Sequence, residues 1–84
     1  MGIFDQRRKW RDLARVLGSA VEIELDRLGS KQAHIVADFI AHNEFGLAHD
    51  QLVDALSDLD LAPLEPTRKL LEQANSLMGH EAKS

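Results

Sequence analysis

The chain has 84 residues, no cysteine and a formal net charge of −4 at pH 7. A chain this short forms one domain, residues 1–84, with a core too thin for a deep substrate cavity. The lack of cysteine excludes disulfide frameworks, thiolate zinc sites and cysteine nucleophiles. No apolar run has the length that crosses a bilayer, and the N-terminus lacks the apolar run of a signal peptide. We therefore expect a cytoplasmic protein with no membrane partner.

The first predicted element is a long helix over residues 5–28, with Asp5 as its N-cap and Gly29 as its end. Apolar residues at three- and four-residue spacing form one stripe along it: Trp10, Leu13, Ala14, Leu17, Val21, Leu25 and Leu28. Gly18 lies inside this pattern, where a helix can kink or divide in two.

Three shorter helices are predicted over residues 31–42, 45–59 and 66–78. Ser30 is the expected N-cap of the first, and Asn43 can take the left-handed conformation that ends it. The apolar faces consist of Ile35, Val36, Phe39 and Ile40, then Ala48, Leu52, Ala55, Leu56 and Leu59, and last Leu70, Leu71, Ala74, Leu77 and Met78.

Four amphipathic helices joined by three short connections predict an all-α fold, a compact antiparallel helical bundle around one core. Trp10, Phe39, Phe45 and the leucines are expected to supply most of the burial energy. Each large apolar side chain contributes about 1.5–3 kcal/mol when fully buried.

No set of residues in the sequence has the pattern of an active site. His42 and His49 lie near Glu44 and Asp50, but their spacing matches no standard pair of metal ligands. No serine lies in a nucleophile elbow, and no group of glycines forms a phosphate-binding loop. We therefore predict no catalytic, metal-binding or cofactor-binding residues, and a protein that is not an enzyme.

Charge is unevenly distributed along the chain. Residues 1–20 carry five cations against two carboxylates, a balance of +3, and residues 21–84 carry five against twelve, a balance of −7. The cations of the first part are Arg7, Arg8, Lys9, Arg11 and Arg15. The acidic remainder favours a basic partner and disfavours nucleic acid.

Asp50, Asp54 and Asp58 are spaced by four, so they share one edge of the third helix, with Glu44 and Asp60 at the margins. Like charges at this spacing destabilise a helix by a few tenths of a kcal/mol per pair. Two interpretations stay open at this point. The five carboxylates form a docking face for a basic protein, or they form an ordinary solvated surface that keeps the domain soluble.

The stretch His42-Asn43-Glu44-Phe45-Gly46-Leu47-Ala48-His49-Asp50, followed by a leucine-rich acidic helix, resembles small helical immunity proteins of the MafI-like family. Glu44, Phe45, Gly46 and Ala48 match the family's Glu-aromatic-Gly-x-Ala motif, with Phe45 in place of the usual tyrosine. Leu52 and Leu56 match its buried leucines, and Leu77-Met78-Gly79 matches its closing pattern. The resemblance covers residues 30–79.

This resemblance implies a non-catalytic antitoxin that binds and blocks one cognate toxin domain of a bacterial polymorphic or contact-dependent system. Many such toxins are nucleases with basic surfaces, which an acidic helix can occupy. The expected partner is therefore a basic toxin domain bound by a monomer.

Two alternatives remain. The first is a helical adaptor or homodimer without a toxin, for which Val16 and Ile23, off the apolar stripe of the first helix, offer a leftover apolar face. The second is a small nucleic-acid-binding protein that uses the cations between Arg7 and Arg15.

Overall fold

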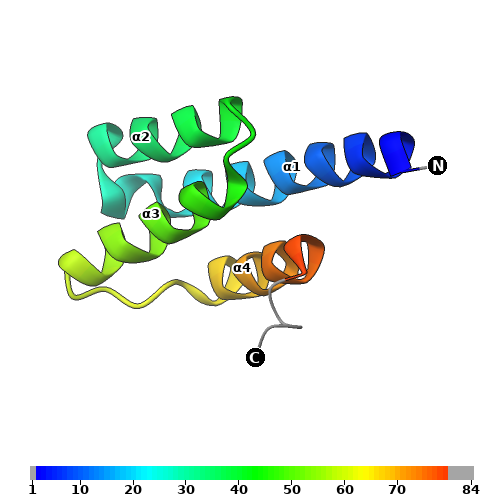
Figure 1. Ribbon diagram of the computed structural model, residues 1–84. Coiled ribbons are helices and arrows are strands. Elements are labelled where there is room, and N and C mark those ends of the chain that lie inside the picture. The colour runs from blue at the N-terminus through cyan, green and yellow to red at the C-terminus, as the bar shows by residue number, and fades with distance from the viewer. Residues whose placement is uncertain (1, 80–84) are drawn as a thin grey trace.

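The computed structural model describes the backbone of residues 2–79 and the side chains of residues 7–79, and this part of the chain is all-α. Its four helices are α1 (Gly2–Leu28), α2 (Ser30–Ala41), α3 (Phe45–Asp58) and α4 (Glu65–Met78). They pack into one bundle, which confirms the predicted fold class (Figure 1).

Helix α1 is the longest helix and runs nearly the full length of the domain. Its 27 residues span about 40 Å at 1.5 Å per residue, close to the longest dimension of the domain, 42 Å. α2 turns back along the C-terminal half of α1, α3 runs back obliquely and packs on both, and α4 runs antiparallel to α1 (Figure 1). α4 packs chiefly on α1 and only lightly on α3.

The predicted helix ends lie within one residue of the observed ones, except at the start of α1. α1 begins at Gly2, so the backbone of Asp5 lies within the helix and Asp5 is not its N-cap. Ser30 is the first residue of α2, and Gly29 at φ 88° is the cap. α1 also continues through Gly18 as one helix, so of the two possibilities named for Gly18, a kink or a division, the division does not occur.

The ends of α2 and α3 use the same turn. Asn43 has φ 60°, as predicted, and Asp60 has φ 59°. After α2, the amides of Asn43 and Glu44 donate to the carbonyls of Ile40 and Phe39. After α3, the amides of Asp60 and Leu61 donate to the carbonyls of Ser57 and Leu56. This paired arrangement satisfies the last carbonyls of each helix and requires one left-handed residue.

The buried face of α1 is rotated from the predicted stripe. Val16, expected off the stripe, is completely buried, whereas Leu25, expected on it, is exposed. Glu24 is also completely buried, near the middle of this face. The face turned inward is the one covered by three other helices, and that coverage depends on where α2, α3 and α4 pack.

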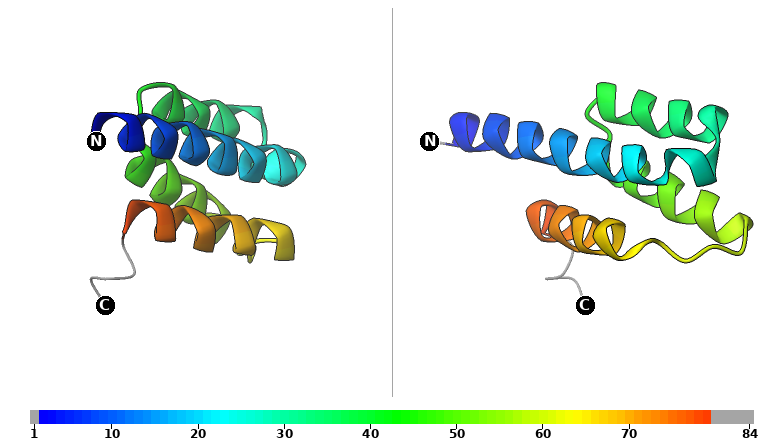
Figure 2. Two further views of the ribbon diagram at one scale, coloured as in Figure 1. Left: turned by 90° about the vertical axis from the view of Figure 1, so that its right-hand side faces the viewer. Right: turned by 180° about the vertical axis from the view of Figure 1, so that it is seen from behind.

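Trp10 is 40% exposed and does not supply the core burial predicted for it. The amide of Leu64 donates to Glu24, and α4 is antiparallel to α1, so Met78 lies level with Trp10. α4 ends at this level, and the turns of α1 on the N-terminal side of Trp10 extend past the end of α4 (Figure 2). The burial comes instead from Phe45 and many aliphatic side chains: Leu13, Val16, Leu17, Val21, Leu28, Val36, Leu52, Leu56 and Leu71.

Candidate functional site

The outer side of α3 carries the predicted docking residues. α3 buries Phe45, Ala48, Leu52, Ala55 and Leu56 against the bundle. At 100° per residue, Asp50, Asp54 and Asp58 fall on the opposite side. All three are exposed, and the side chain of Asp50 is 73% exposed. We call these three residues the α3 acidic face.

The α3 acidic face is not neutralised by the rest of the described chain. Among residues 7–79, none of its carboxylates forms an ion pair with a lysine or arginine. Asp50 lies 3.4 Å from Nδ1 of its neighbour His49, and Asp54 and Asp58 have no side-chain hydrogen bond there. The three negative charges therefore face solvent together.

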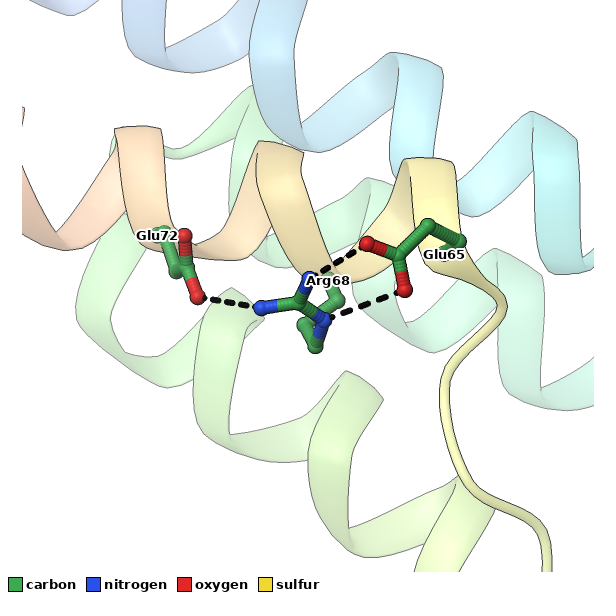
Figure 3. Close-up of polar contacts among 3 residues, drawn as sticks. All are labelled: Glu65, Arg68 and Glu72. Atoms are coloured by element: carbon green, nitrogen blue, oxygen red, sulfur yellow. Dashed lines mark hydrogen bonds and ion pairs between the residues drawn. The ribbon is translucent and has the colours of Figure 1, made fainter.

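The acidic residues of α4 are arranged differently. Arg68 lies between Glu65 and Glu72 on the surface of α4 (Figure 3). Its Nη1 donates to Glu72 Oε2 at 2.7 Å, while Nε and Nη2 donate to both oxygens of Glu65. The hydrogen bonds and charge of Arg68 lower the pKa of Glu65. These carboxylates are neutralised locally, which sets the α3 acidic face apart.

Glu44 and Asp60, the two predicted residues at the margins of this face, differ in their structural roles. Glu44 is exposed at the start of α3, where its carbonyl accepts the amide of Ala48 and its carboxylate makes no capping bond. Asp60 is exposed too, but it also supplies the left-handed residue that ends α3. Asp60 therefore has a structural role that the sequence analysis did not assign.

Leu47 belongs to the same exposed surface and was not singled out from the sequence. It is 52% exposed and precedes Asp50 by three positions, so it lies next to the α3 acidic face. Its signal in the sequence is its phase, because the apolar residues of α3 that reach the core lie on the other side of the helix. The surface thus combines one apolar side chain with three charges.

Within the part of the chain that the structure describes, the histidines do not gather around a ligand site. His42 Nδ1 lies 2.8 Å from the carbonyl oxygen of Asp38, and this hydrogen bond, with the charges of Asp38 and Glu44, raises the pKa of His42. His49 lies beside Asp50. Among the side chains of residues 7–79, no three His, Asp or Glu are placed to hold a metal ion, and no pocket is present there. No helix of this part is long and apolar enough to span a bilayer.

A polar contact around the buried Glu24 joins α1 to the loop before α4. Glu24 Oε2 accepts the Leu64 amide at 2.8 Å, and Arg27 Nη2 donates to the Ala62 carbonyl at 2.7 Å. Glu24 Oε1 and Arg27 Nη1 are 3.1 Å apart, an ion pair without hydrogen-bond alignment. Because both hydrogen bonds run from α1 to the loop before α4, the contact holds this loop and α4 in place. The sequence analysis missed it.

Comparisons with known protein families, with curated proteins and with solved structures found no match to this chain.

Proposed function

We propose that this chain is a non-catalytic immunity protein, which binds a basic toxin domain in the cytoplasm through the α3 acidic face and blocks it. The observation that carries the proposal is that Asp50, Asp54 and Asp58 are exposed and unneutralised by the described residues. The assignment to a toxin comes from the resemblance of residues 30–79 to MafI-like immunity proteins.

The cost of this surface to the fold supports a role in binding. Two like-charged pairs at four-residue spacing each destabilise the helix by about 0.2–0.5 kcal/mol. Asp58 also lies in the last turn of α3, where the helix dipole disfavours a negative charge. Glutamate and lysine in alternation would serve the fold better, so a partner that uses the aspartates accounts for their presence.

Binding gains more from these charges than folding loses. Opposite charges that lose solvent at a protein interface couple by about 1.5–7 kcal/mol per pair. A concentrated negative surface also accelerates encounter with a basic partner, in a manner that salt suppresses. Leu47 adds an exposed apolar side chain beside the charges, and protein interfaces commonly combine apolar contacts with a polar rim.

The test begins with the product of the adjacent upstream gene, expressed alone and together with this chain. We expect the gene product to kill cells and co-expression to rescue them. The triple variant Asp50→Lys, Asp54→Lys, Asp58→Lys should stay helical and bind the toxin at least about 100-fold more weakly, a loss of about 2.7 kcal/mol.

A matched control reverses three other exposed carboxylates, Glu22→Lys, Asp26→Lys and Asp38→Lys, with the same change in net charge. It should keep nearly full affinity. If the α3 variant still rescues and binds as the wild type does, the docking face lies elsewhere. An adjacent gene product that is harmless and unbound would instead favour a helical adaptor. The homodimer alternative has lost part of its basis, because Val16 lies in the core.

A further inference from the structure

A second row of charges on this molecule has the same spacing as the α3 acidic face and the opposite sign. Arg7, Arg11 and Arg15 follow one another at four-residue intervals on α1 and are exposed. Both rows repeat about every 6 Å along their helix axes, at 1.5 Å per residue. We call the three arginines the α1 basic row. Three charges on one helix are thus matched, position by position, by three on the other.

The arginines are available for contact. Within the described residues, Arg7 and Arg11 form no ion pair. Arg15 Nη2 lies 3.6 Å from Asp12 Oδ1 on its own helix, and the Arg15 side chain remains 65% exposed. An exposed pair of this kind contributes little, so a better arrangement of carboxylates can replace it.

One molecule cannot bring the two rows together. At 100° per residue, the α1 basic row lies opposite Leu13, Leu17 and Ala20, which are buried in the bundle. The α3 acidic face likewise lies opposite the buried face of its own helix. Since α1 and α3 pack against each other through these buried sides, the two rows point away from one another. The N-terminal turns of α1 also extend past the end of α4, which leaves this end of the basic row uncovered (Figures 1 and 2).

We propose that copies of this chain associate head to tail, the α1 basic row of one copy lying on the α3 acidic face of the next. The occupant of each row is thus a second copy of the same protein. Because the two rows point apart, the contact does not close into a two-fold dimer and leaves one free row at each end. Exposed ion pairs are individually weak, so the association is reversible and belongs to high protein concentration and low salt.

This association does not rest on the proposed function, although the two would interact. A bound copy covers the carboxylates assigned to the toxin, so a toxin domain and a second copy compete for one surface. Excess immunity protein would then mask its own docking face until a more basic partner displaces it.

Sedimentation velocity on the full chain tests the proposal directly. At about 20 mM salt, where charges act over about 20 Å, the weight-average mass should rise with concentration and pass the mass of a dimer. At about 1 M salt, where the screening length is about 3 Å, the protein should sediment as a monomer. A monomer under both conditions across the concentration range would overturn the proposal.

Two neutralised variants make the pairing specific. Arg7→Gln, Arg11→Gln, Arg15→Gln keeps only the acidic row, and Asp50→Asn, Asp54→Asn, Asp58→Asn keeps only the basic row. Each alone should be monomeric at low salt, and their equimolar mixture should form a complex that stops at one copy of each. If the mixture stays monomeric while both variants are folded by circular dichroism, the rows do not pair.

A control and one competing occupant complete the test. Glu22→Gln, Asp26→Asn, Asp38→Asn changes the net charge as the acidic-row variant does and should still associate. The competing occupant of the arginines is nucleic acid. If the wild type stays monomeric at low salt but binds a short DNA duplex, and the arginine variant loses that binding, the α1 basic row serves nucleic acid and the proposal fails.

Discussion

Replacing Glu24 with alanine should destabilise the domain more than any other single carboxylate substitution in residues 7–79. Glu24 is the one completely buried carboxylate of that part of the chain, and it accepts the Leu64 amide while pairing with Arg27. Its removal leaves a buried donor without an acceptor, a charge without its partner and a small cavity.

The structure sets the size of the effect. Breaking a buried ion pair costs about 3–5 kcal/mol when the remaining charge has nowhere to go. Here Arg27 is 24% exposed and keeps its hydrogen bond to the Ala62 carbonyl, so it can recruit water. We therefore expect Glu24→Ala to lower the free energy of unfolding by about 3 kcal/mol. At about 4–8 °C per kcal/mol for a domain of this size, the Tm should fall by roughly 12–24 °C.

Glu24→Gln is the matched control. Glutamine keeps the volume and an oxygen that can accept the Leu64 amide, but its NH2 group then faces Arg27 Nη1, another donor. The ion pair is lost while the hydrogen bond to Leu64 stays, so the expected cost is about 2 kcal/mol, below that of Glu24→Ala. Urea unfolding followed by circular dichroism measures both variants, and hydrogen exchange at the Leu64 amide reports the local contact. The reasoning is refuted if Glu24→Ala unfolds within about 0.5 kcal/mol of the wild type, or if Glu24→Gln is as damaging as Glu24→Ala.

Three further predictions concern other polar groups. Thr67→Val should raise the free energy of unfolding, measured by urea titration, by about 1 kcal/mol. The reason is that the buried Thr67 hydroxyl finds no hydrogen-bond partner among the described residues. A loss of stability would mean that the hydroxyl is bonded. Asp58→Lys should raise the Tm by about 4 °C at low salt and by less at high salt. The substitution removes a like-charge pair and places a positive charge at the C-terminal end of α3, which the helix dipole favours. A lower Tm would show that Asp58 stabilises the fold. His42 should titrate above 6.5 by NMR, and Asp38→Asn should remove only part of that shift, since the carbonyl acceptor remains. A raised pKa means that protonated His42 favours the folded state, so this contribution is present in acid and fades as pH rises past the pKa of folded His42; a pKa at or below 6.5 would contradict the hydrogen bond to Asp38.

The α3 acidic face could be located from the sequence because its exposure depends on one helix. Leu52 and Leu56 identify the side of α3 that packs, and Asp50, Asp54 and Asp58 must then lie on the other side. The periodicity of α3 does not predict whether a lysine or arginine from another helix neutralises these aspartates. The fold leaves Arg68 with its own glutamates on α4, and so leaves the three aspartates unpaired within the described chain.

Local rules fixed the elements of this protein and tertiary packing fixed which surfaces they bury. Helix type, length and ends follow from spacing and from residues such as Gly29 and Asn43, whose backbone preferences act within a few positions. The inward face of α1 does not follow, since its apolar stripe is broad enough to pack in more than one rotation. The packing of α2, α3 and α4 on α1 decides that Val16 and Glu24 are buried and Leu25 is exposed. The burial of a residue on α1 depends on side chains that lie far from it along the chain.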